Sequence, residues 1–231
     1  MKKKRFKSEG HCNLCGKNIE GDKISGHLME CRDKLFKNND ARPANIMQIS
    51  AYGRHTPEFW LQLAVWDGAT LSDIDNFLRY TWLECCGHLS AFNINGARYE
   101  SRPADDDDDA FPFGEKPLSM SAKLSKVLEP GTVMLHEYDF GTTTELELEV
   151  LDVFQGAKPI ADVILLAHNL KPKIKCRSCE KIATLICSGC CYDFQCFCKK
   201  CAPRHECGKD MMLPLVNSPR TGMCGYDGPG L

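Results

Sequence analysis

The sequence predicts an α+β protein, in which a central, mostly antiparallel sheet with one main helix is flanked by two small zinc-binding modules. Short strand-like segments dominate the middle of the chain, and one segment there has helical periodicity. The 15 cysteines are concentrated at the two ends. Charge follows the same division, because residues 41–170 carry 9 Lys+Arg against 20 Asp+Glu, whereas both ends are basic.

These boundaries predict four segments. We expect a zinc finger with a basic arm in residues 1–40, a linker in 41–56, an α+β domain in 57–170 and a cysteine-rich module in 171–231. The 43% of hydrophobic residues excludes a mostly disordered chain. The sequence contains no apolar run that approaches the ~18 residues of a membrane span, and no apolar segment follows the basic N-terminus as in a secretion signal. We therefore expect a cytoplasmic protein without a membrane partner, whose thiols stay reduced and bind metal.

The first ligand set has the pattern C-x2-C-x11-H-x3-C, formed by Cys12, Cys15, His27 and Cys31. Two thiolates from one tight turn, with a histidine and a cysteine one helical turn apart, match the tetrahedral shell of zinc. His11 is an alternative ligand with a poorer spacing. The basic run at residues 2–7 is interpreted as a solvated tail or, less simply, as an arm that contacts phosphate.

The central segment contains several strand signals and one helix signal. The helix is expected from Thr70, a capping residue with an acid three positions later, to about residue 86, before Gly87. Asn95-Gly96 indicates a hairpin. The other expected elements are strands at 59–66, 90–94, 98–100, 133–140, 144–151 and 161–167 and a short helix at 124–128. The five aspartates of 105–109 are interpreted as a solvated loop, because calcium loops space their ligands differently.

Three other central residues are given structural rather than functional interpretations. Cys85 and Cys86 are expected to be small buried apolar groups rather than a redox pair. His88 is interpreted as a capping residue after Gly87 rather than a catalytic base, because no nucleophile lies at a diagnostic spacing.

The C-terminal segment contains three C-x-x-C knuckles followed by a His/Cys pair. Eight ligands of this kind suffice for two tetrahedral zinc ions, which makes two to three zinc ions per chain in total. Thiolate-rich shells of four ligands are typical of structural sites. Cys191, Cys196 and Cys224 remain over, and any of them could replace a member of the set. The ligands are Cys176, Cys179, Cys187, Cys190, Cys198, Cys201, His205 and Cys207.

This C-terminal arrangement resembles a MYND-type, cross-braced zinc finger over about 32 residues. The resemblance implies that the ligands alternate along the chain between two ions. It implies one site made of Cys176, Cys179, Cys198 and Cys201. It implies a second site made of Cys187, Cys190, His205 and Cys207.

The central segment resembles the Ri-plasmid ORF-3-like family, also labelled insertion-element passenger proteins of the TnpR type. Three pieces carry the resemblance over residues 57–169: Thr70-Leu71-Ser72-Asp73-Ile74, the run from His88 to Gly96 with Tyr99, and Tyr138-Asp139-Phe140-Gly141. It implies an α+β domain of prokaryotic and mobile-element proteins without an established activity.

These observations predict a zinc-binding interaction protein, more plausibly non-catalytic than an enzyme. The sequence contains no Walker loop, dinucleotide fingerprint, nucleophile elbow or H-E-x-x-H motif. The partner is expected to be a protein or a nucleic acid: the basic ends favour nucleic acid, and the acidic centre opposes a broad nucleic-acid groove. The alternative is a mobile-element-associated accessory protein that binds or processes nucleic acid.

Overall fold

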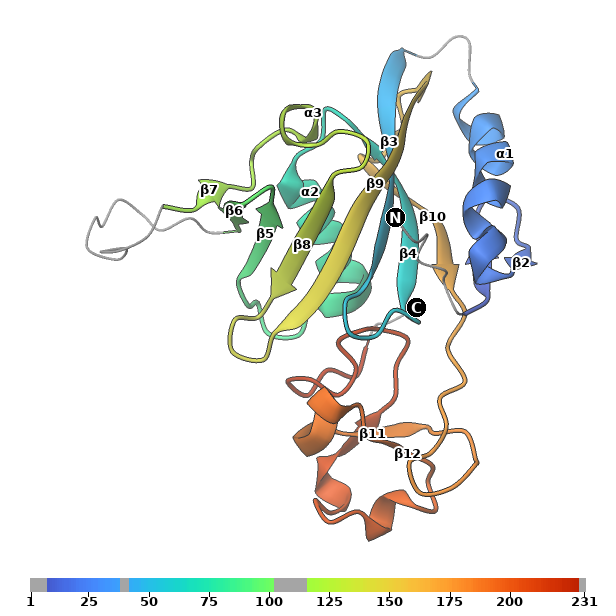
Figure 1. The fold of residues 1–231 in the computed structure, drawn as a ribbon, viewed down its shortest axis with the longest axis vertical. Helices are drawn as coiled ribbons and strands as arrows, with labels where there is room; N and C mark the ends of the chain where they lie inside the picture. Colours follow the sequence, from blue (N-terminus) through green and yellow to red (C-terminus); the bar gives the residue numbers. More distant parts are fainter. Residues whose placement is uncertain (1–7, 38–41, 102–115, 229–231) are drawn as a thin grey trace.

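The computed structural model describes residues 8–37, 42–101 and 116–228, which form one large twisted sheet and a smaller C-terminal module (Figure 1). The sheet has ten strands in the order β2-β1-β10-β4-β3-β9-β8-β5-β6-β7. Its pairings are antiparallel except for that of β6 with β7. The expected α+β class is therefore confirmed. The strands are β1 Gly10–Cys12, β2 Asn18–Ile19, β3 Pro43–Gly53, β4 Trp60–Trp66, β5 Ser90–Ile94, β6 Ala97–Glu100, β7 Leu118–Ser119, β8 Val133–Tyr138, β9 Thr144–Ala157 and β10 Val163–Asn169.

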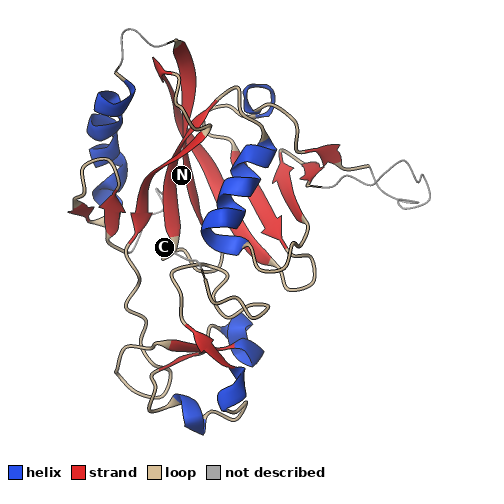
Figure 2. Ribbon diagram, turned by 180° about the vertical axis from the view of Figure 1, so that it is seen from behind, coloured by secondary structure: helices blue, strands red, loops and turns tan. Residues whose placement is uncertain are grey.

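One face of the sheet is covered by helix α2 (Leu71–Leu78), as Figure 2 shows, and by the short α3 (Leu124–Val127). Thr70 and Asp73 form the expected capping box at the start of α2. One π-helical turn, Arg79–Leu83, continues the helix and ends it before the predicted stop at Gly87. The largest hydrophobic cluster lies between α2 and this face, and Trp82 is fully buried in it.

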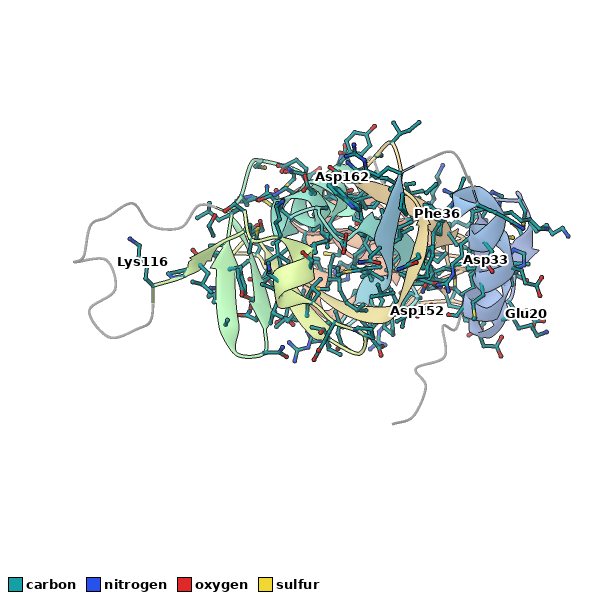
Figure 3. The ribbon with its side chains drawn as sticks, turned by 90° about the horizontal axis from the view of Figure 1, so that it is seen from above. Glu20, Asp33, Phe36, Lys116, Asp152 and Asp162 are labelled. Carbon is teal, nitrogen blue, oxygen red and sulfur yellow. The ribbon has the colours of Figure 1, made fainter. Side chains whose placement is uncertain are left out.

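The opposite face is covered at one end by helix α1 (Ile24–Phe36). Seen from above in Figure 3, α1 with Asp33 and Phe36 lies at one end of the sheet, and Lys116 lies at the other. Ile24 and Leu28 are fully buried in a second hydrophobic cluster against the sheet. Because β1 also pairs with β10, the N-terminal segment is part of the sheet and packs on it.

The expected linker at 41–56 is wrong, because β3 occupies Pro43–Gly53 in the middle of the sheet, between β4 and β9. Met47, Ile49 and Ala51 enter the large cluster, whereas the polar Gln48 is buried on the α1 side and accepts a hydrogen bond from Arg32. The run Met47-Gln48-Ile49-Ser50-Ala51 alternates between apolar and polar residues as a strand does, and the linker interpretation did not use this signal.

The C-terminal module lies beyond one end of the large sheet (Figure 1). A three-stranded sheet in the order β12-β11-β13 forms its centre. Short 3-10 turns at 188–193, 202–204 and 209–211 complete it. Its strands are β11 Leu185–Cys187, β12 Cys196–Phe197 and β13 Met212–Pro214.

The segment after β13 returns to the central domain. The Ser218 hydroxyl donates to the Trp82 carbonyl oxygen at 2.7 Å, and the fully buried Arg220 donates to the Asp139 carboxylate at 2.8 Å. The tail, residues 215–228, therefore packs on the central domain.

Two sequence features, the basic run at 2–7 and the aspartates at 105–109, lie outside the described residues. In the part of the chain that is described, no helix combines the length and the apolar character needed to cross a membrane.

Candidate metal centres

The N-terminal ligand set begins in a tight turn that closes β1. Gly16 N–H donates to the Cys12 carbonyl oxygen at 2.8 Å, and Gly16 has the positive φ of +72° that a glycine adopts without strain. Asn13 N–H donates to the Leu166 carbonyl oxygen at 2.9 Å, which fixes this turn to β10. The sheet thus holds Cys12 and Cys15 in place before any metal contact is considered.

Helix α1 supplies the other two groups of this set. His27 and Cys31 are four residues apart, and the Cys31 Sγ lies 3.4 Å from the His27 Nε2. The Cys15 Sγ lies 3.3 Å from the same nitrogen. With Zn–S and Zn–N bonds of about 2.3 and 2.05 Å, the S···N edge of a tetrahedron is roughly 3.6 Å. The spacing therefore fits a tetrahedral divalent ion, and the four ligand atoms lie within 4.8 Å of one another.

His11, the alternative ligand, lies outside this cluster. Its Nδ1 is 2.9 Å from the Asn18 Oδ1, and its ring lies 5.6 Å from that of His168. The structure thus brings together the four residues with the better spacing and leaves His11 on the neighbouring strand edge.

The C-terminal module contains two clusters. Cys176, Cys179, Cys198 and Cys201 form the first, and Cys179 Sγ lies 3.7 Å from the sulfurs of both Cys198 and Cys201. A tetrahedral S···S edge around zinc is roughly 3.8 Å, whereas a disulfide bond is about 2.05 Å. All 15 cysteines are free. These sulfurs are therefore spaced for a shared ion and not for a disulfide.

The second C-terminal cluster consists of Cys187, Cys190, His205 and Cys207. Cys190 Sγ lies 3.5 Å from His205 Nε2 and 3.6 Å from Cys207 Sγ. The ring of His205 is held against Phe197 of β12, with 4.6 Å between ring centroids. The two clusters alternate along the chain in the order that the MYND resemblance implies.

The thiols of the first C-terminal cluster differ in their readiness to ionise. Burial opposes ionisation of Cys176, but the backbone N–H groups of Cys198 and Ser178 outweigh it and lower the pKa of Cys176 to about 6. The hydrogen bond with Cys179 raises the pKa of Cys201 to about 12. Without a cation, one thiol of the cluster ionises easily and its neighbour does not. A divalent cation would stabilise all four thiolates together.

The structure also forms a fourth cluster, from Cys85, Cys86, His88 and Cys224. This corrects the expectation that Cys85 and Cys86 are buried apolar groups, because Cys86 is exposed and Cys85 is only partly buried. Sequence spacing does not indicate this cluster, because Cys224 is 136 positions from His88. The available signal was the local group Cys-Cys-x-His together with a cysteine unassigned elsewhere.

Two cysteines, Cys191 and Cys196, belong to none of the four clusters. Both are buried, and burial raises the pKa of Cys196 to about 12. Cys196 packs with Ile186 and Leu215 in a small hydrophobic cluster. These thiols have the environment of core residues.

Comparison with known proteins assigns no family to this chain. No protein-family model matches it, and no curated protein matches it. Among solved structures it is similar to a protein of unknown function, MM3350, from Methanosarcina mazei Go1. The two are 18% identical over 54% of this chain and 69% of that chain, with a TM-score of 0.44.

Proposed function

We propose that this chain is a zinc-binding, non-catalytic interaction protein, whose predicted N-terminal and C-terminal ligand sets hold structural zinc ions. The observation that carries the proposal is that these ligands form three clusters of four, one N-terminal and two C-terminal. Neighbouring ligand atoms within them lie 3.3–3.7 Å apart. Catalytic zinc sites keep one position for water or substrate, whereas closed shells rich in thiolate stabilise a fold.

Membership of the Ri-plasmid ORF-3-like family is part of this proposal. Its support is that two of the motif pieces meet in space. Asp139 N–H donates to the Leu89 carbonyl oxygen at 2.9 Å, and the ring of His88 packs edge-on against Tyr138. Residues that carry the resemblance thus share one end of the β5–β8 pair.

The interaction surface is proposed to combine an acidic sheet and a basic module. Glu145, Glu147 and Glu149 alternate with buried residues along β9 and line one side of that strand. In the C-terminal module, Lys199, Lys200 and Arg204 are exposed beside the zinc ligands. These cations neutralise part of the negative charge of zinc-bound thiolates, since a four-cysteine site has a formal charge of about −2.

That neutralisation favours a protein partner over a nucleic acid. A module that is basic by sequence loses part of its positive field once its thiolates are ionised and bound to zinc. The second candidate, a mobile-element-associated protein that binds nucleic acid, is supported by the same exposed basic residues.

Metal content and salt dependence test the proposal. We expect elemental mass spectrometry of protein purified without added zinc to find zinc, and Cys→Ser changes in each predicted set to remove it. In a mobility-shift titration with nucleic acid, we expect to find no salt-sensitive binding. Metal-free protein would reject the proposal.

The nucleic-acid alternative has a matched comparison. Strong salt-dependent binding that Lys199→Ala with Lys200→Ala weakens would favour it. The control pair, Lys123→Ala with Lys126→Ala, removes two exposed lysines of the central domain. If both pairs weaken binding equally, the contact is unspecific and the module is not the binding surface.

A further inference from the structure

The fourth cluster joins two segments that are far apart in sequence. Cys85, Cys86 and His88 lie in the connection between the π-helical turn and β5. Cys224 lies in the tail, and its Sγ is 3.5 Å from the His88 Nε2. This distance is close to the roughly 3.6 Å expected for a tetrahedral S···N edge around zinc. The four ligand atoms lie within 4.8 Å of one another, as in the other three clusters.

The backbone of the tail is bent so that Cys224 meets this group. Cys224 has a φ of +48°, and the following Gly225 has a φ of +70°. Tyr226 N–H donates to the Met223 carbonyl oxygen at 2.8 Å and closes the turn. A positive φ is uncommon for any residue except glycine and costs about 1 kcal/mol. An exposed cysteine in this conformation has no packing role to explain it, whereas a ligand role does.

Buried contacts hold the tail in this place independently of the cluster. Arg220 donates to the Asp139 carboxylate at 2.8 Å and to the Thr144 hydroxyl at 3.0 Å. The same guanidinium lies 3.3 Å from the Cys85 Sγ. The tail therefore brings to the cluster both a fourth ligand and a cation that offsets the charge of the thiolates.

The other clusters do not need Cys224. Each of the two C-terminal clusters already has four ligands, and Cys224, which the sequence left as a possible replacement in that set, lies in a different cluster. Three sulfurs and one imidazole form a closed shell, which suits zinc in a structural role.

The geometry points to a fourth zinc site, formed by Cys85, Cys86, His88 and Cys224, which clasps the tail to the central domain. It differs from the other sites in exposure. Each of them contains at least one buried cysteine, whereas Cys86 and Cys224 are exposed and Cys85 and His88 are half-buried. Its ion is consequently the one most open to solvent and to competing ligands.

Zinc stoichiometry in single and double variants tests the site. We expect Cys224→Ala to hold one zinc ion fewer per chain than the wild type, and Cys86→Ala to show the same loss. The double variant should also lose one ion and not two, because both residues serve one site. Met223→Ala is the control, since it alters the neighbouring side chain of the same turn and should keep the full content.

The outcomes separate this site from the other three. Equal zinc content in the wild type and Cys224→Ala overturns the fourth site and leaves the proposed function intact. Loss of two ions in the double variant also overturns it. Loss of zinc from Met223→Ala would mean that content follows tail packing rather than ligation, and would overturn it as well.

Thiol reactivity provides a second measurement on the unmodified protein. Cys86 and Cys224 are exposed, so as free thiols both are accessible to an alkylating reagent, and a chelator would not change their rate of reaction. Bound to zinc, they should react slowly and become reactive after a chelator is added. Immediate alkylation of both in the native protein, or a Cys85–Cys86 disulfide in it, overturns the site.

Discussion

The central sheet and the C-terminal module are held together by different groups. The sheet has a large core of aliphatic and aromatic side chains, with Leu63 and Phe92 fully buried in it. The main buried cluster of the module consists mostly of cysteines, with Phe197 as its one large apolar side chain among the described buried residues. A segment of this size buries too little apolar surface to fold alone, and under the proposed function metal ligation supplies the rest. The core of the central sheet thus consists of apolar side chains, whereas that of the C-terminal module consists mostly of cysteines.

Removal of metal should affect the two regions differently, and it should have the largest effect on stability of the changes considered. Structural zinc sites contribute about 10 kcal/mol or more each to folding. We expect a chelator to unfold the C-terminal module and to leave the amides of β3, β4 and β9 protected. Hydrogen exchange measured by mass spectrometry reports both regions at once. A module that stays protected without metal would contradict the comparison.

A cavity in the sheet core should have the opposite pattern. Leu63→Ala removes a fully buried side chain of β4 and should lower the free energy of unfolding by about 3 kcal/mol, with no change in zinc content. Denaturant unfolding and elemental analysis of the same sample check this. Leu35→Ala, at a site that is about half exposed, is the control and should change stability little. Zinc loss from Leu63→Ala would show that the two regions are coupled.

A smaller effect is expected from the buried, hydrogen-bonded carboxylate of Asp75, which links α2 to β8. His136 Nε2 lies 2.7 Å from the Asp75 carboxylate, which also accepts a hydrogen bond from Arg79. Burial would raise the pKa of Asp75, but its bonds to His136 and Arg79 outweigh burial and hold that pKa below its usual range. Asp75→Asn should cost about 2 kcal/mol at neutral pH.

The direction of the pH effect follows from that lowered pKa. The carboxylate of Asp75 contributes stability above its unfolded pKa near 3.9, and this contribution is lost as the pH falls through the lower folded pKa. The stability difference between wild type and Asp75→Asn should therefore shrink on acidification below about pH 4. Asp73→Ala, which removes one half of the capping box, should cost about 1 kcal/mol and serves for scale. A difference independent of pH would exclude the ionised carboxylate of Asp75 as its source.

The smallest effect is expected from a cysteine that is not a ligand. Cys196→Ala should keep the full zinc content and cost about 1 kcal/mol, because its sulfur only packs in a small apolar cluster. Cys198→Ala, two positions away, should lose one zinc ion and destabilise the whole module. Urea titration and elemental analysis of this pair sharpen the distinction between sulfur as filler and sulfur as ligand. Equal behaviour of the two variants would remove that distinction.

The ligand sets could be predicted where spacing is local. Two cysteines in one turn are recognised by their C-x-x-C spacing, as for Cys12 with Cys15 and for the three C-terminal knuckles. The α+β class and the capping box at Thr70 also followed from periodicity and local hydrogen bonding. These features depend on residues within a few positions of one another.

The misses concern long-range contacts. β3 lies in the middle of the sheet because β4 and β9 pair with it, and its buried polar Gln48 finds hydrogen-bond partners in Arg32 of α1 and Gln62 of β4. The fourth cluster forms only where the tail packs on the central domain. The hydrogen bond from Arg220 to Asp139 is one of the contacts that place the tail there. A buried polar group whose partner is far away in sequence looks like a loop residue until the fold is known.

The pairing of β1 with β10 has a consequence for how the protein is made. The ribosome releases Cys12, Cys15, His27 and Cys31 while most of the sheet is still untranslated. If the proposed zinc ion binds here, the nascent chain contains all four of its ligands long before the sheet is complete. The apolar face of α1, with Ile24 and Leu28, gains its cover only when β4 and β10 have emerged and the sheet has formed.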